Sequence, residues 1–372
     1  MKKAVKRMTA VLAAGLMVFG MTACGAQPGQ SAPAKSAAAP AGGKPYIAII
    51  SKGFQHQFWQ VVKKGADQAA ADLGCTVTFE GPPSESDIQI QVDELKAALD
   101  KKPAAICLAA LDTESVKDQL MACKNNGVPV VGFDSGVPNA PAGTIYATAS
   151  TDNHAAAALA ADNLMKNADF TAKVTAATAS APVYVGVLSQ DATSESITGR
   201  TQGFIDELTK LIGADKVDVS GHDKYAKPNP NASVRIVVNI PATTSAADLK
   251  SGAEALLTGA NKPIAIYGSN EGAAGGILAA SNDGQDFAAG GKFAGIVAIG
   301  FDAGKTQKVA VTNGWFYGSI TQDPYQIGYK AVALAMDALS GKPAASPVVD
   351  TGAKWYNKNN ITDPMINDLV YD

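Results

Sequence analysis

Two aspartates stand at matching places in the two halves of the sequence. Asp134 lies in the run VVGFDSG and Asp302 in the run IGFDAG, and the apolar residues before each aspartate predict a buried strand. Ligands of open α/β sheets bind beyond the carboxyl ends of the strands. The pair therefore predicts two carboxylates that face one ligand. The alternative is that each aspartate caps the helix or turn that follows it.

Residues for covalent or metal chemistry are scarce. The three histidines, His56, His154 and His222, form no HExxH motif, and the sequence has no GxxxxGK[ST] phosphate loop. The serine of GFDSG stands outside the pattern of a nucleophile elbow. The glycine-rich run 271–276 lacks GxGxxG spacing and is more typical of close helix packing. The sequence therefore predicts binding without catalysis, with no metal and no cofactor.

Short apolar runs alternate with longer helical stretches from Tyr46 onward. This pattern is typical of parallel sheets covered on both faces by helices, so we expect an α/β fold with two doubly wound lobes. The expected strands are 46–50, 76–79, 105–108, 128–133, 183–188, 234–238, 264–267 and 296–301. The expected helices are 58–73, 88–99, 116–124, 197–211, 246–257, 273–280 and 305–311.

The N-terminus has the layout of an export signal. Positive residues within 2–7 precede an uncharged apolar run, 8–20, which is shorter than the roughly 20 residues that a spanning helix needs. The segment MTACG that follows resembles the lipobox of bacterial lipoproteins. The resemblance implies a signal peptide at 1–23 and a lipid on Cys24, which would anchor the protein to the outer face of the cell membrane or in the periplasm. An ordinary cleaved signal is the alternative.

The segment 24–44, after the lipobox cysteine, is nearly all Ala, Pro, Gly, Ser and Gln. It cannot bury enough apolar surface to fold, so it predicts a flexible tether. The remaining residues, 45–372, are long enough for two ordinary domains.

Charge and cysteine content narrow the class of partner. The net charge is −3 and the body has no run of Lys or Arg, so nucleic acid is not an expected partner. Cys75, Cys107 and Cys123 remain after Cys24. An odd number in an oxidising compartment leaves at least one thiol unpaired. We favour buried, unpaired thiols over a Cys107–Cys123 bridge.

Several motifs in sequence order resemble those of a known family. They are IAIISKGFQHQFWQVVKKGADQAAADLG, GVPVVGFDSG, STDN, GRTQGF, IYGSNEG, GFDAG and ITQDPYQIGYKAVALAMDALSGK. The chain resembles the periplasmic sugar-binding proteins of ABC importers, the group that includes ribose-binding protein. The resemblance implies the type I periplasmic binding protein fold, in which three hinge strands join the lobes. The N-lobe would be 45–149 plus 323–349, and the C-lobe 150–322 plus 350–372.

The resemblance also implies a set of ligand contacts. Phe58 and Trp59 would stack on the C–H face of a sugar, the two aspartates would accept its hydroxyls, and Arg200 would donate to its oxygens. The alternatives are core packing for the aromatic pair and a surface salt bridge for the arginine. The full set is Ser51, His56, Phe58, Trp59, Asp134, Arg200, Asn270, Asp302 and Gln322.

Some positions depart from the ribose-binding pattern. Ser135 stands in place of a second arginine, Thr244 in place of a stacking aromatic, Ala110 in place of a polar residue and His56 in place of an asparagine. These departures leave the particular sugar open among pentoses, hexoses and related polyols.

The resemblance implies a monomer that captures a monosaccharide outside the cell and delivers it to an ABC permease with a separate ATPase subunit. One alternative is a sensor that presents the ligand to a chemoreceptor or sensor kinase. A transcriptional regulator and an extracytoplasmic hydrolase are less favoured, because DNA-binding helices and a nucleophile–base pair are missing from the sequence.

Overall fold

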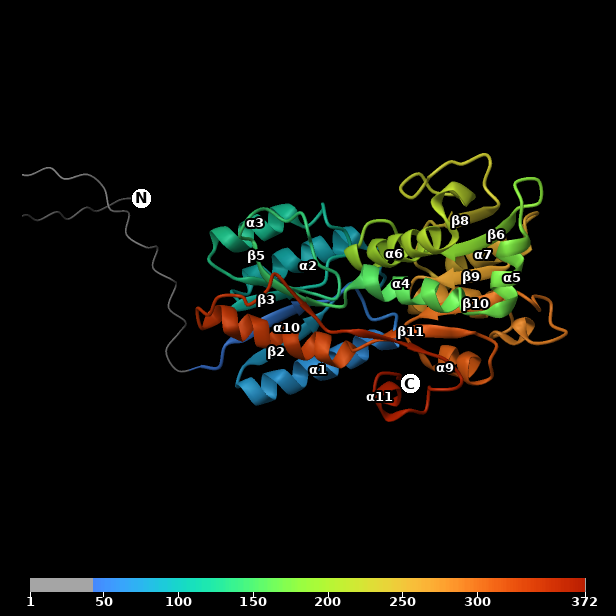
Figure 1. Cartoon of the computed structure of the whole chain (residues 1–372). Helices are drawn as coiled ribbons and strands as arrows, with labels where there is room; N and C mark the ends of the chain where they lie inside the picture. Colours follow the sequence, from blue (N-terminus) through green and yellow to red (C-terminus); the bar gives the residue numbers. More distant parts are fainter. Residues whose placement is uncertain (1–42, 372) are drawn as a thin grey trace, which may run out of the picture. The chain divides into compact units, whose positions relative to one another are not determined.

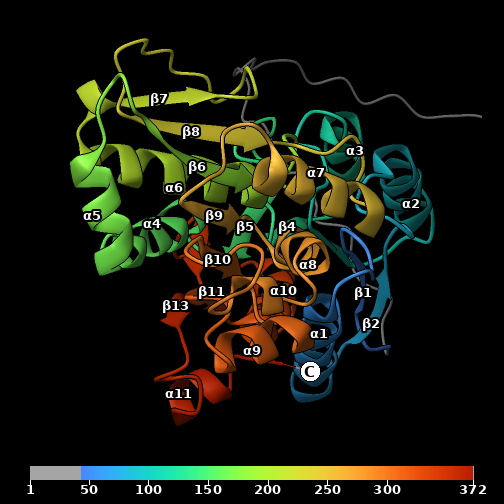
Figure 2. The same ribbon diagram turned by 90° about the vertical axis from the view of Figure 1, so that its right-hand side faces the viewer.

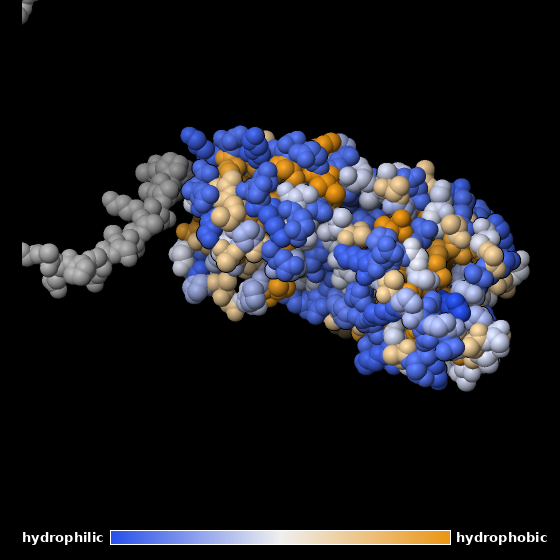
Figure 3. Space-filling model, turned by 90° about the horizontal axis from the view of Figure 1, so that it is seen from above, coloured by the Kyte–Doolittle hydropathy of each residue, from blue (hydrophilic) through white to orange (hydrophobic). Residues whose placement is uncertain are grey.

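The computed structural model describes residues 43–371. The predicted signal peptide, Cys24 and nearly all of the predicted tether lie outside the described residues. Among the residues that the structure describes, no helix combines the length and apolar character needed to cross a membrane. Figure 3 shows hydrophilic residues over most of the visible face, with separate hydrophobic patches between them.

The first lobe, the N-lobe, is built on a six-stranded sheet in which every pair is parallel. The strand order is β12-β5-β4-β3-β1-β2. The strands are β1 (Tyr46–Ile50), β2 (Thr76–Glu80), β3 (Ala105–Leu108), β4 (Val130–Phe133), β5 (Ile145–Ser150) and β12 (Val348–Asp350).

Helices cover both faces of this sheet because its strands are apolar on both sides. In β1, Ile47 and Ile49 pack with one pair of helices, whereas Ala48 and Ile50 pack with the other pair. Figure 1 shows the two layers of helices on either side of the strands. The first pair is α1 (Gln57–Leu73) and α10 (Pro324–Leu339), and the second is α2 (Ile88–Asp100) and α3 (Lys117–Asn125).

Helices α1 and α10 approach each other backbone to backbone. A Cβ atom at Gly65 would collide with the carbonyl oxygen of Tyr325, and one at Gly328 would collide with that of Val62. Glycine at these two points is required by the close approach of the helices, so α1 and α10 form one tightly packed layer.

The second lobe, the C-lobe, has a seven-stranded sheet of order β13-β11-β10-β9-β6-β8-β7. Its pairs are parallel except that β13 at the edge runs antiparallel to β11. The strands are β6 (Val183–Leu188), β7 (Val217–Ser220), β8 (Val234–Asn239), β9 (Ala265–Gly268), β10 (Val297–Phe301), β11 (Gly318–Gln322) and β13 (Ala353–Tyr356).

The helices of the C-lobe also form two layers (Figure 2). One face carries α4 (Asn153–Leu164) and α6 (Glu195–Ile212), and the other carries α7 (Ala246–Thr258), α8 (Glu271–Ala280) and α9 (Lys305–Thr312). The smaller elements are α5 (Ala168–Ala176), α11 (Pro364–Asn367) and the 3-10 turns Ala214–Lys216 and Gln285–Phe287.

The predicted fold class is confirmed, and each strand and helix expected from the sequence is present within a few residues. The pattern of apolar runs did not single out β5, β7, β11, β12, α4, α5, α10 or α11. Helices α4 and α10 begin within the motifs STDN and ITQDPYQIGYKAVALAMDALSGK quoted above. Strand β5 reads IYATAS and α5 has one buried residue, so neither contains an apolar run. The antiparallel β13 was also not anticipated. All three described cysteines are free and buried, as favoured above.

The chain passes between the two sheets at three places, after β5, after β11 and after β12. The Thr151 hydroxyl donates to Gln322 Oε1 at 3.0 Å and lies 3.3 Å from the carbonyl oxygen of Gly352. The amide of Asp152 donates to Asp350 Oδ1 at 3.1 Å. Side chains therefore link all three crossing segments to one another.

Candidate ligand-binding site

The two aspartates singled out by the sequence occupy equivalent positions in the two lobes. Asp134 follows β4 and Asp302 follows β10, and both have left-handed backbones, with φ of 54° and 69°. Each amide donates to the neighbouring strand, Asp134 to Ala149 at 2.9 Å and Asp302 to Ile320 at 2.6 Å. Asp is one of the few residues that visits this backbone region readily, so the repeated sequence encodes a repeated turn.

These turns bring the aspartates to one cavity between the lobes. Its volume is about 20 Å³, which is enough for about one water molecule. A larger ligand therefore enters only if the lobes separate or the lining side chains move. The cavity is lined by Lys52, His56, Phe58, Trp59, Glu85, Asp134, Ile197, Arg200, Asn270, Asp302 and Gln322.

The lining contains most of the residues predicted as ligand contacts. Ser51 is absent from it: the Ser51 hydroxyl lies 3.2 Å from the carbonyl oxygen of Gly53 and 3.1 Å from that of Glu80, and donates to this backbone. The other eight predicted residues are brought together. They are His56, Phe58, Trp59, Asp134, Arg200, Asn270, Asp302 and Gln322.

The aromatic wall comes from the start of α1. Phe58 and Trp59 meet edge to face, with ring centroids 5.0 Å apart, and both are buried. The indole Nε1 of Trp59 donates to Glu85 Oε1 at 2.8 Å. The pair also belongs to the hydrophobic core beneath α1 and α10. Both rings therefore line the cavity and pack in the core, and their stacking on a sugar stays a prediction.

The sequence reasoning missed a buried cation, Lys52, at the end of β1. Its ammonium lies 3.6 Å from Glu85 Oε2 and 3.7 Å from Asp134 Oδ2, and it donates to the hydroxyl of Ser196 at 3.2 Å. Burial alone would lower the pKa of Lys52, but Glu85, Asp134 and Asp191 together raise it. The side chain is therefore a fixed positive charge in the cavity wall.

Glu85, also missed, is held in its ionised form. Burial would raise its pKa, but the charges of Lys52 and His56 and the hydrogen bonds from Trp59 and Gln190 lower the pKa of Glu85 to about 2. Gln190 Nε2 donates to Glu85 Oε2 at 2.9 Å across the interlobe boundary.

Asp134 differs from Glu85 although both face Lys52. Its nearest cations, Lys52 and Arg200, lie 3.7 and 4.0 Å away, which is beyond hydrogen-bond distance. Burial raises the pKa of Asp134, and the attraction of the two cations does not offset it. The carboxylate oxygens of Asp134 can therefore accept hydrogen bonds from a ligand.

The opposite wall is organised by Arg200 on α6. The side chain is buried, which excludes the surface salt bridge considered above. Its Nε donates to Asn153 Oδ1 at 2.9 Å, Nη1 lies 3.5 Å from Asp302 Oδ2, and the guanidinium stacks 4.0 Å above the Phe301 ring. These contacts hold the guanidinium fork in one orientation.

Asp302 is tied to the hinge and to α8. Gln322 Nε2 donates to Asp302 Oδ1 at 2.6 Å, and the amide of Glu271 donates to Oδ2 at 2.9 Å. Asp302 thus caps α8, rather than the helix that follows it in sequence. Asn270 precedes α8 and lines the cavity; its Oδ1 accepts from the amide of Ala273 at 2.9 Å, and its Nδ2 donates to Gln190 Oε1 at 2.8 Å.

Within the described residues, no cluster of His, Cys, Asp and Glu is suited to hold a metal ion. The cavity offers carboxylates, cations and amides from both lobes together with two aromatic rings. Two α/β lobes that share one such cavity, with three crossings between them, define a hinged solute-binding protein.

The comparisons with known proteins agree with this class. The family model described as a periplasmic binding protein domain matches residues 47–343. The chain therefore belongs to the periplasmic binding protein family.

Individual relatives are consistent with this assignment. The D-allose-binding periplasmic protein of Escherichia coli (strain K12) is 23% identical over 300 residues, which cover 79% of this chain and 85% of the relative. A Brachyspira murdochii structure, described as an ABC transporter, LacI family transcriptional regulator, is 38% identical with a TM-score of 0.72, and the match covers 88% of this chain and 99% of that one. An ABC transporter solute-binding protein from Agrobacterium vitis, with bound D-fucose, is 28% identical with a TM-score of 0.72, covering 88% and 100%.

Proposed function

We propose that this protein captures a monosaccharide or related polyol outside the cell and delivers it to the permease of an ABC transporter. The observation that carries the proposal is the cavity between the lobes, in which Asp134 comes from one lobe and Arg200 with Asp302 from the other. Ring hydroxyls would bridge the two lobes and favour the closed arrangement. The D-fucose complex of the Agrobacterium vitis relative supports a sugar as ligand.

The charges of the cavity favour an uncharged ligand. Three carboxylates, Glu85, Asp134 and Asp302, face the two permanently charged cations, Lys52 and Arg200, in the lining. This balance repels phosphorylated or acidic sugars. Phe58 and Trp59 would stack on the C–H face of the ring, and the carboxylates would accept its hydroxyls.

The proposal extends to the location of the protein and its partners. The protein acts as a monomer without catalysis, is exported by the segment 1–23, and is held at the cell membrane by a lipid on Cys24 and the tether up to residue 44. The N-lobe, 45–149 with 323–349, and the C-lobe, 150–322 with 350–372, move about the hinge. The ATPase is a separate subunit.

A thermal-shift screen of the exported protein tests the ligand class. Pentoses, hexoses, inositols and short oligosaccharides are compared with amino acids and nucleosides. A tight ligand raises the melting temperature by mass action, and we expect this from a monosaccharide or polyol. A shift with amino acids or nucleosides alone would contradict the proposal.

Mass spectrometry of the membrane-extracted protein tests the lipid on Cys24.

A further inference from the structure

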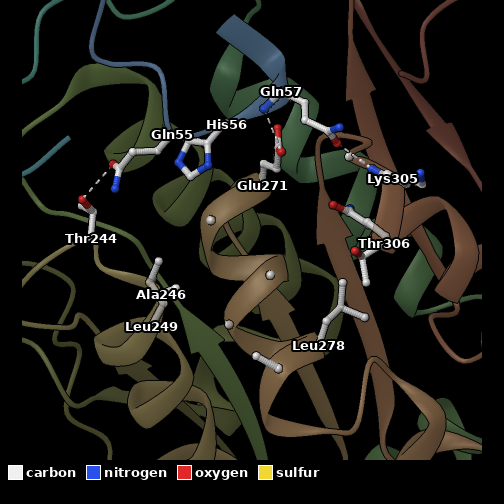
Figure 4. A pocket seen from close by; sticks show the side chains of 16 residues that line it. Gln55, His56, Gln57, Thr244, Ala246, Leu249, Glu271, Leu278, Lys305 and Thr306 are labelled. Atoms are coloured by element: carbon white, nitrogen blue, oxygen red, sulfur yellow. Dashed lines mark hydrogen bonds between the residues drawn. The ribbon is translucent and has the colours of Figure 1, made fainter. Parts of the chain in front are cut away.

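Helix α1 of the N-lobe begins without a cap of its own. The side chain of His56 at its N-cap makes no capping hydrogen bond, and its first turn has no acidic residue. A carboxylate from the C-lobe takes this place: Glu271 Oε1 accepts from the amide of Gln57 at 3.0 Å, and Oε2 accepts from that of Phe58 at 3.1 Å. Figure 4 shows Glu271 directed at Gln57. A carboxylate at a helix N-terminus satisfies free amides and the positive end of the helix dipole.

The reverse contact caps a helix of the C-lobe. Helix α9 starts after Gly304, which has no side chain to cap it, and the first turn of α9 has no acidic residue. Gln57 Oε1, from the N-lobe, accepts from the amide of Lys305 at 2.9 Å (Figure 4). Each lobe therefore supplies the side chain that caps a helix of the other.

These contacts lie beside the cavity and not in its wall. Glu271 and Gln57 line a neighbouring hollow of about 350 Å³ between the segment after β1 and helices α7, α8 and α9. Glu271 is nevertheless connected to the cavity, because its backbone amide donates to the carboxylate of Asp302. The residue that orients a cavity carboxylate thus also reaches across to the other lobe.

We propose that this reciprocal capping is a closure latch, in which Glu271 and Gln57 act as positioning residues that stabilise the closed lobes without touching the ligand. The inference rests on the proposed function, because closure of the lobes around a ligand is the state that the latch stabilises. When the lobes separate, the amides at both helix N-termini lose these side-chain acceptors and bind water instead. The latch therefore contributes to the closed state alone, and through it to the lifetime of the bound complex.

Calorimetry and stopped-flow binding test the latch with a sugar identified in the thermal-shift screen. Loss of a helix cap corresponds to roughly a 2- to 30-fold change in an equilibrium constant. We expect Glu271→Ala and Gln57→Ala each to raise Kd by such a factor, mainly through faster dissociation, with an unchanged melting temperature of the ligand-free protein. Glu254→Ala is the matched control, because Glu254 is a glutamate on α7 of the same lobe whose side chain is 47% exposed and pairs with Lys250.

Hydrogen exchange measured by mass spectrometry separates the two caps, with and without sugar. Glu271→Ala should speed exchange at the amides of Gln57 and Phe58, and Gln57→Ala should speed it at Lys305. A merely structural role would not give this crossed pattern.

The outcomes distinguish the latch from the proposed function. Tight sugar binding in Glu271→Ala with wild-type Kd and wild-type exchange at the start of α1 overturns the latch and leaves the function intact. Absence of binding of any sugar by the wild-type protein, with the crossed exchange pattern appearing in the presence of a non-sugar ligand found in the screen, overturns the function and keeps the latch. Identical exchange in every variant under all conditions overturns the latch in either case.

Discussion

Replacement of Asp134 by asparagine separates ligand binding from stability more cleanly than replacement by alanine. The backbone of Asp134 is left-handed, with φ of 54°. Asparagine tolerates this conformation, whereas alanine would add strain of roughly 1–2 kcal/mol. Asparagine also keeps the shape of the side chain and one acceptor, so the change removes the charge and replaces the other acceptor by a donor.

The magnitude follows from the surroundings of the carboxylate. Its cations lie at 3.7 and 4.0 Å, so its oxygens are free to accept sugar hydroxyls in charge-assisted hydrogen bonds. Such a bond contributes about 1.5–3 kcal/mol, which corresponds to roughly a 10- to 150-fold weaker Kd for Asp134→Asn. Because burial raises the pKa of Asp134, the ionised carboxylate does not stabilise the fold at neutral pH. The ligand-free melting temperature should therefore stay the same or rise.

Isothermal titration calorimetry gives Kd, and a thermal melt without sugar gives the stability. Asp100→Asn, at an exposed position at the end of α2, is the matched control and should change neither value. The reasoning is refuted if Asp134→Asn binds sugar as tightly as the wild type. It is equally refuted if the ligand-free protein loses several degrees of stability, since the carboxylate would then be a structural group.

Three further outcomes are expected. Glu85→Gln should lower the unfolding free energy by on the order of 3 kcal/mol at neutral pH, because ionised Glu85 stabilises the fold above pH 4.5. This contribution disappears as the pH falls toward the Glu85 pKa of about 2, so the variant should lose less unfolding free energy than the wild type between pH 4.5 and 2. Urea unfolding at several pH values would contradict this if the variant showed the wild-type pH dependence. Gly272→Ala places a methyl group against Gln190 Oε1 and 2.9 Å from the His56 ring of the opposite lobe, so calorimetry should show weaker sugar binding. Gly328→Ala forces α10 against the Val62 carbonyl and should lower the unfolding free energy by about 3 kcal/mol or more; a wild-type urea midpoint would show that the helices can separate freely.

The sequence predicted the layered fold because apolar strands and helices of ordinary length can be recognised from the spacing of their apolar residues. It predicted the paired aspartates because both lobes use the same turn after a central strand. The sequence did not predict the roles of Lys52 and Glu85, because a lone lysine or glutamate in a loop is usually exposed. Only the approach of the segment after β1 to the loop before α2 buries the two residues as a pair.

Ser51 is the one predicted contact that the cavity lining does not include. Its hydroxyl donates to the backbone of Gly53 and Glu80. Lys52, one residue further along, lines the cavity instead.

The glycine contacts between α1 and α10 have a mechanical consequence. Helix α10 starts immediately after the crossing segment that follows β11, and α1 carries the amides that Glu271 caps. At Gly65 and Gly328 the two helices touch through backbone atoms, with no rotatable side chain between them. Such a contact is stiff. A small rotation of α10 at the hinge therefore moves α1 as well, including the amides at its start that Glu271 caps.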